Sequence, residues 1–242
     1  MSGKQGRRIA AAACAAAVLM ATAACGGGGN DGDRQNSGSS AQAGPKPLTE
    51  RQLHAAVLEG EFGTYGVTKP SGGDAPISDM YTAQPEVCQP LVSLTEGATQ
   101  HDPVAEVVRD VSDQYADLGD AIDTDLHLRS YTAEEAAVVM TALGRAGEEC
   151  AGGFTEERTL VEAKVLKVET LKAPALGDEA HAFRIVTQDV KEADIKLYDY
   201  LTVVRSGSTL LSFRADQLST KDFGGVPQDV IDAQWKKFRR TP

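Results

Sequence analysis

The segment LYDYLTVVRSGSTLLSFRA, residues 197–215, has the clearest structural signal in this chain. Its two apolar runs, 197–204 and 209–215, are rich in β-branched and aromatic side chains, and RSGS between them is a turn sequence. We therefore predict a β-hairpin here. Two further strands are expected before it, at 160–171, where apolar residues alternate with charges, and at 180–186.

Earlier parts of the chain contain helical patterns. Thr49 with Gln52, and Thr132 with Glu135, have the spacing of capping boxes, in which side chains satisfy free backbone N–H groups at a helix start. The second box opens a predicted helix that runs to about Cys150. The remaining expectations are an irregular segment at 60–85, a helix at 85–97, a strand favoured over a helix at 104–111, a strand at 125–131 and a last helix after Pro227.

Helices that precede a meander of strands predict an α+β domain. We expect an antiparallel or mixed sheet with helices packed mainly on one face. The chain has 242 residues, 41% of them hydrophobic and 24% charged, which is enough to bury one core. Because no second linker interrupts the pattern, a single domain is expected over 48–242.

The first 24 residues have the features of a secretory signal peptide: a basic start and then the uncharged, Ala-rich run 9–24. This run is shorter than the roughly 20 apolar residues that a bilayer-spanning helix needs. The run leads into Cys25, and the sequence TAAC at residues 22–25 resembles the bacterial lipobox. We expect residues 1–24 to be removed and Cys25 to carry acyl chains, palmitate among them. Ordinary secretion with a free Cys25 is the alternative.

Residues 26–47 read GGGGNDGDRQNSGSSAQAGPKP and predict a flexible tether, so 25–47 would comprise the lipidated cysteine and its linker. Removal of the signal leaves 21 basic against 35 acidic side chains, a net charge of −14. Such a chain gains nothing from anionic headgroups, and the acyl chains would supply the attachment to the extracytoplasmic face of the cell membrane. The same charge argues against nucleic-acid binding.

Cys88 and Cys150 are the cysteines left for the folded domain, because Cys14 is removed with the signal. An even pair in an oxidising compartment predicts a disulfide that joins two helical segments. The alternative is a reactive thiol, which would need a histidine partner, and no histidine is adjacent to either cysteine in the sequence.

Motifs of known catalytic or metal chemistry are absent from the sequence: it has no HExxH, no CxxC and no GxSxG. Asp123, Asp125 and Glu134 have the spacing of an EF-hand loop, but Leu128 stands where the turn needs glycine. We therefore predict no catalytic residue, no metal and no cofactor. Scattered carboxylates leave a hydrolase open as a less favoured alternative, because such carboxylates need only spatial proximity.

Five segments together are recognisable. They are CQPL at 88–91, SYT at 130–132, CAGGF at 150–154, LTVV at 201–204 and LLSF at 210–213. Their order over the predicted domain resembles the sensor-like extracytoplasmic domain of actinobacterial lipoproteins, which is related to the external domain of PknH-type receptor kinases.

The resemblance implies an α/β domain with a cleft that senses or binds a ligand outside the cell, and it implies no established enzymatic activity. We therefore expect a cell-surface lipoprotein whose non-catalytic domain binds a small or apolar ligand, or an envelope partner. The alternative is a structural or interaction lipoprotein without a ligand cleft.

Overall fold

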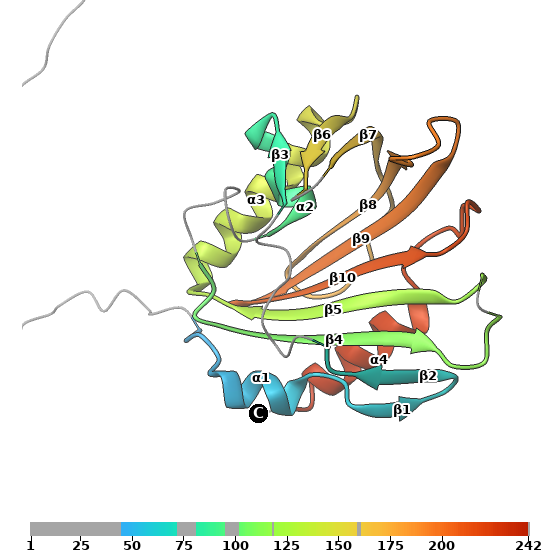
Figure 1. Cartoon of the computed structure of the whole chain (residues 1–242). Helices are drawn as coiled ribbons and strands as arrows, with labels where there is room; N and C mark the ends of the chain where they lie inside the picture. The colour runs from blue at the N-terminus through green and yellow to red at the C-terminus, as the bar shows by residue number, and fades with distance from the viewer. Residues whose placement is uncertain (1–44, 72–80, 95–101, 118, 159–160, 242) are drawn as a thin grey trace, which may run out of the picture. The chain divides into compact units, whose positions relative to one another are not determined.

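The computed structural model describes residues 45–241, apart from 72–80, 95–101, 118 and 159–160. In this part of the chain ten strands form one sheet, in the order β1-β2-β4-β5-β10-β9-β8-β7-β6-β3, and every neighbouring pair is antiparallel (Figure 1). The strands are β1 Gly60–Phe62, β2 Tyr65–Thr68, β3 Thr82–Gln84, β4 Ala105–Asp113, β5 Ile122–Ser130, β6 Phe154–Glu157, β7 Glu162–Thr170, β8 Glu179–Gln188, β9 Lys196–Ser206 and β10 Thr209–Gln217.

The helical segments are α1 Glu50–Ala56, the 3-10 turn η2 Glu86–Cys88, α2 Gln89–Val92, α3 Ala133–Glu149 and α4 Gln228–Phe238. Both predicted capping boxes form: the side chains of Thr49 and Thr132 accept the backbone N–H of Gln52 and Glu135. Among the described helices, none is long and apolar enough to cross a membrane.

Apolar side chains alternate between the two faces of the sheet, and each face packs against helices. The core beneath α1 and α4 includes Leu53, Val107, Leu126, Phe213 and Ile231. The core beneath α3 and α2 includes Leu91, Met140, Leu143, Phe183 and Leu201. The predicted α+β class with an antiparallel sheet is confirmed. The helices divide between the two faces instead of gathering mainly on one, because both faces are apolar (Figure 1).

The strands predicted at 104–111, 125–131, 160–171 and 180–186, and the hairpin at 197–215, are all confirmed. β6 was not among the predicted strands; it is four residues long and pairs with β7. So short a strand shows too few alternations for its period to be recognised.

Residues 60–85 are less irregular than predicted. β1 and β2 form a hairpin at one edge of the sheet, with Gly63 in the turn at a φ of 57°, and β3 pairs with β6 at the other edge. The helix predicted at 85–97 covers only 86–92, because Ser93 has extended backbone angles.

A disulfide joins Cys88 in η2 to Cys150, the C-cap residue of α3, with Cα atoms 5.9 Å apart. Both cysteines are buried. Neither cysteine lies in the sheet. The disulfide therefore fixes the η2–α2 segment against α3, and the strands are held together by their own backbone hydrogen bonds.

Helical periodicity places Val230, Ile231, Trp235 and Phe238 on the apolar side of α4, and the structure departs from this pattern at Trp235. Val230 and Ile231 are buried, whereas Trp235 is half-buried and stacks on Phe238. Gln234 is fully buried instead. Its amide accepts the N–H of Leu58 at 2.8 Å and donates to the carbonyl of Ala56 at 2.9 Å, and it thereby satisfies backbone groups at the end of α1.

Candidate functional site

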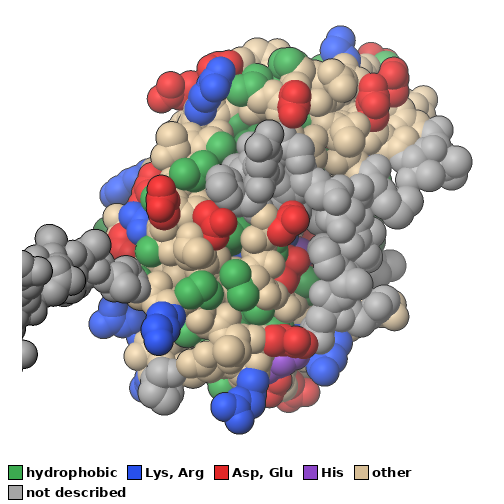
Figure 2. Space-filling view, turned by 90° about the vertical axis from the view of Figure 1, so that its left-hand side faces the viewer, with side chains coloured by type: hydrophobic (Ala, Val, Ile, Leu, Met, Phe, Trp, Pro, Cys, Tyr) green, Lys and Arg blue, Asp and Glu red, His purple; other side chains and the backbone are tan. Residues whose placement is uncertain are grey.

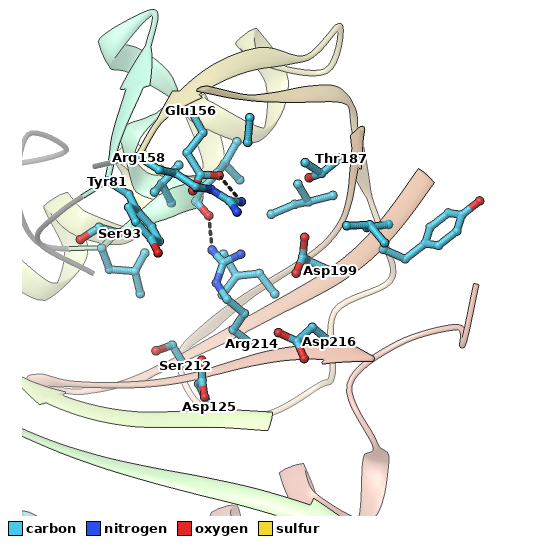
Figure 3. A pocket seen from close by; sticks show the side chains of 18 of the residues that line it. Tyr81, Ser93, Asp125, Glu156, Arg158, Thr187, Asp199, Ser212, Arg214 and Asp216 are labelled. Carbon is cyan, nitrogen blue, oxygen red and sulfur yellow. Dashed lines mark hydrogen bonds and ion pairs between the residues drawn. The ribbon is translucent and has the colours of Figure 1, made fainter. Parts of the chain in front are cut away.

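A cavity of about 710 Å³ lies on the face of the sheet that packs against α3 and α2. Side chains of β5, β8, β9 and β10 form its floor, and residues of β6 and α2 contribute to its walls (Figure 3). We call this cavity the groove. It exists because α3 contacts β7–β10 and α2 is a single turn, so that the helices leave part of this face uncovered.

The register of the sheet brings residues far apart in sequence together in the groove. Asp125 on β5 pairs with Arg214 on β10, and Arg214 pairs with Leu201 on β9. Asp199 on β9 pairs with Ile185 on β8. Paired residues project to the same face of a sheet, and this ladder therefore places acidic, basic and apolar side chains beside one another.

Three carboxylates, Asp125, Asp199 and Asp216, line the groove near the side chain of Arg214, whose guanidinium points toward α2 (Figure 3). Arg214 Nη2 donates to the backbone carbonyl of Leu91 on α2. Within the described residues none of the three carboxylates has a hydrogen bond or a close ion pair. This end of the groove therefore has more negative charge than its own side chains neutralise.

The pKa values of these carboxylates are raised, first by burial and then by neighbouring negative charges. Burial raises the pKa of Asp199 to about 6; the charge of Arg214 opposes the shift and that of Asp216 adds to it. Burial also raises the pKa of Asp125 to about 6, with contributions from Asp110 and Asp216. Burial is the first cause of a raised pKa at Asp216 as well. Ionisation of this cluster is thus opposed by the fold.

Apolar side chains form the adjoining part of the groove and its rim. Phe154, Ile185 and Leu201 are buried in the wall and floor. At the rim, Val190 is 49% exposed and Leu218 is 77% exposed. Exposed aliphatic side chains beside a cavity offer apolar contact area that the fold itself does not use.

Arg158 and Glu156, which also line the groove, form an ion pair with each other. Arg158 Nε donates to Glu156 Oε1 at 2.9 Å, and the guanidinium lies over the ring of Tyr81 at 5.4 Å. Both partners of this ion pair lie on the wall opposite the three carboxylates (Figure 3). The pair leaves Arg158 little capacity to neutralise them.

A buried network lies at the end of the floor. Arg129 Nε is 2.6 Å from Glu106 Oε1, and Arg129 Nη1 donates to Ser212 Oγ at 3.0 Å. Burial would raise the pKa of Glu106, but the charge of Arg129 and the hydrogen bond with His127 lower it. Burial and the charge of Arg129 lower the pKa of His127 to about 4, so its ring is neutral at physiological pH.

We expect Asp199→Asn to raise the melting temperature at pH 7.5. The raised pKa means that a charged Asp199 destabilises the folded state relative to the unfolded chain, where the ordinary value is 3.8. Its stabilising contribution is complete below about pH 4 and is lost as the pH rises through about 6. Differential scanning calorimetry should therefore show the advantage of the Asn variant at pH 7.5 and its loss at pH 4.

His127 also affects the stability of the domain over this pH range. Its lowered pKa acts in the opposite direction, because the unfolded chain takes up a proton between pH 6.5 and about 4. The parent protein and the Asp199→Asn variant both contain His127. The difference between their melting temperatures therefore reports Asp199 alone. An equal difference in melting temperature at both pH values would show that Asp199 is not perturbed by burial.

The residues singled out in the sequence relate to the groove in different ways. Cys25 lies outside the described residues, as do the predicted signal peptide and most of the tether. Cys88 and Cys150 hold α2 and α3, which flank the groove, but they do not line it. Asp123 and Asp125, considered for an EF-hand loop, lie in β5, as the strand interpretation predicts. Asp199, Asp216 and Arg214 were not predicted as site residues from the sequence.

The chain is similar in structure to solved proteins. No protein-family model and no curated protein matches the chain. The crystal structure of the extracellular domain of PknH from Mycobacterium tuberculosis matches with a TM-score of 0.51 at 12% identity, over 81% of this chain and 97% of that one. The Rv0999 ortholog from Mycobacterium smegmatis, described as an uncharacterized protein, has a TM-score of 0.36 at 12% identity, over 74% of this chain and 91% of that one. The chain thus has the fold of the PknH extracellular domain, which the resemblance in sequence predicts.

Proposed function

We propose that this protein is an extracytoplasmic lipoprotein whose folded domain binds a small ligand in the groove without chemical conversion. The observation that carries this proposal is the groove itself, where unneutralised carboxylates adjoin an apolar wall. Its volume of about 710 Å³ lies within the roughly 300–1,000 Å³ of small-molecule sites. Such sites combine an apolar lining with placed polar groups. Half of the residues that line this groove are apolar, and the other half are polar or charged.

The placement outside the cytoplasm is supported by three features. The sequence of the first 25 residues has the pattern of a lipoprotein signal, and the Cys88–Cys150 disulfide suits an oxidising compartment. The fold is also that of a domain described as extracellular in PknH.

The chain enters the domain at the end of the sheet away from the rim of the groove. The carbonyl of Lys46 accepts a hydrogen bond from Ser208 Oγ, and the N–H of Leu48 donates to Ser130 Oγ. Ser130 and Ser208 lie at one end of β5 and at the β9–β10 turn, whereas Val190 and Leu218 belong to loops at the opposite strand ends (Figure 1). Figure 2 views the entry end, where acidic, basic and apolar side chains are interspersed. Residues 46–48 are therefore held at the end of the sheet away from Val190 and Leu218.

The groove can be tested with N-phenyl-1-naphthylamine, an uncharged dye whose fluorescence rises in apolar sites. We expect saturable binding of one dye molecule per domain, and weaker binding by the double variant Val190→Ser/Leu218→Ser, because both side chains are exposed at the rim. Their removal should leave the melting temperature unchanged, since exposed side chains contribute little to stability.

Val104→Ser is the matched control for the dye experiment. Val104 is 64% exposed, lies immediately before β4 and does not line the groove. It should bind dye like the parent protein. If the rim variant and the control bind alike, the groove is not the apolar site. If the parent shows no saturable binding, a structural lipoprotein without a ligand cleft is the better account.

A further inference from the structure

We propose that the ligand of the groove is an amphiphile with a cationic head, held by Asp125, Asp199 and Asp216, with its apolar part against Ile185 and Leu201. This inference rests on the proposed function and adds to it the chemical class of the ligand. It follows from the charge of the groove, from the register of the sheet and from the exposed rim.

Two of the three described arginines that line the groove are already paired with acidic side chains. Arg158 is paired with Glu156, and Arg129 is paired with Glu106. Arg214 is the remaining described cation among the lining residues, and its Nη2 donates to the carbonyl of Leu91.

The acids near Arg214 outnumber it. Asp125, Asp199 and Asp216 line the groove near its side chain, and Asp110 on β4 lines the same cavity beside Asp125. Asp123, which pairs with Asp216, adds negative charge at the edge of the groove. A ligand that brings a positive charge would relieve the repulsion among these carboxylates, whereas an anionic head would increase it.

The head and the apolar part of such a ligand would contact adjacent positions of the ladder. Asp199 is paired with Ile185, and Arg214, between Asp125 and the other two acids, is paired with Leu201. Neighbouring paired side chains in an antiparallel sheet have Cβ atoms about 5 Å apart. A molecule whose charge lies among the carboxylates therefore reaches apolar wall within one residue spacing, which favours an amphiphile over a simple hydrated cation.

The rim extends the apolar surface out of the groove. Leu218 follows β10 two residues after Asp216, and Val190 lies in the loop that joins β8 to β9. Both side chains are exposed although they are aliphatic. An alkyl chain that leaves the carboxylate end would cover them, and this explains their exposure better than a small polar ligand does.

Isothermal titration calorimetry with three ten-carbon amphiphiles, each below its micelle concentration, tests the proposal. We expect decyltrimethylammonium to bind at least about tenfold more tightly than decyl sulfate or uncharged decyl maltoside. The variants Asp199→Asn and Asp216→Asn should each weaken binding of the cation about tenfold and leave binding of decyl maltoside unchanged.

The control variant Glu148→Gln distinguishes binding of the cation in the groove from its general attraction to an acidic protein. Glu148 is exposed on α3 outside the groove, and its substitution changes the net charge as much as the groove variants do. It should bind the cation like the parent. Equal effects of Glu148→Gln and Asp199→Asn, or preference for decyl sulfate, would overturn the cationic head. If the parent protein binds the uncharged dye but none of the amphiphiles, the proposal of an amphiphilic ligand is wrong and the proposed function stands. If the parent protein binds neither the dye nor any amphiphile, the proposed function is wrong as well.

Discussion

Glu106→Gln should destabilise the domain by roughly 3–5 kcal/mol, the cost of removing one partner from a buried ion pair. The Arg129 side chain is only 4% exposed, and its Nε lies 2.6 Å from Glu106 Oε1. Without the carboxylate, the guanidinium would remain charged and buried, with only the uncharged Ser212 Oγ and His127 ring as side-chain hydrogen-bond partners within the described residues. Urea denaturation followed by circular dichroism would measure the loss.

Glu149→Gln is the control for that measurement. Glu149 pairs with Arg145 at 2.6 Å, but both side chains are largely exposed at the end of α3. Solvent screens this pair, and its loss should produce little measurable change. If Glu106→Gln is no more destabilising than Glu149→Gln, the buried network does not contribute to the stability of the sheet.

Replacing both Cys88 and Cys150 by alanine should lower the free energy of unfolding by about 4 kcal/mol. The disulfide spans a sequence separation of 62, and closing a loop of that length restricts the unfolded chain by about this amount in the chain-entropy model. The strands should persist, because neither cysteine lies in the sheet. Urea denaturation would give the loss, and far-UV circular dichroism should retain the β-sheet signal.

The same variant should affect the groove. Cys88 precedes α2, whose Leu91 carbonyl accepts the hydrogen bond from Arg214. Loosening α2 would therefore weaken dye binding as well as stability. Titration of the unreduced parent with a thiol reagent provides the control, since Cys88 and Cys150 should not react. Two reactive thiols in the folded parent would rule out the disulfide.

The elements that could be predicted from sequence are those whose signals are local. The capping boxes at Thr49 and Thr132 lie within four residues, and both form. The alternation in 197–215 extends over enough residues to define strands and their faces. By contrast, β1, β2 and β3 are three or four residues long, and in so short a strand alternation carries little information.

The groove could not be predicted, because it is a product of register. Asp125 and Asp199 line the same groove only because β5 and β9 both pair with β10, and no spacing in the sequence reports this arrangement. Gln234 was missed for a related reason. Helical periodicity placed apolar residues on the inner side of α4, but the unpaired backbone groups at the end of α1 required a buried amide there.

Native mass spectrometry tests the central claim, that the groove holds a ligand, most directly. The Cys25→Ala chain would be collected without detergent from the culture medium of the organism that produces the protein. We predict that a small molecule remains bound to this chain, and that the same chain with Val190→Ser and Leu218→Ser retains less of it. Spectra that show the bare mass for both chains, or an equal retained mass on both, would contradict ligand binding in the groove.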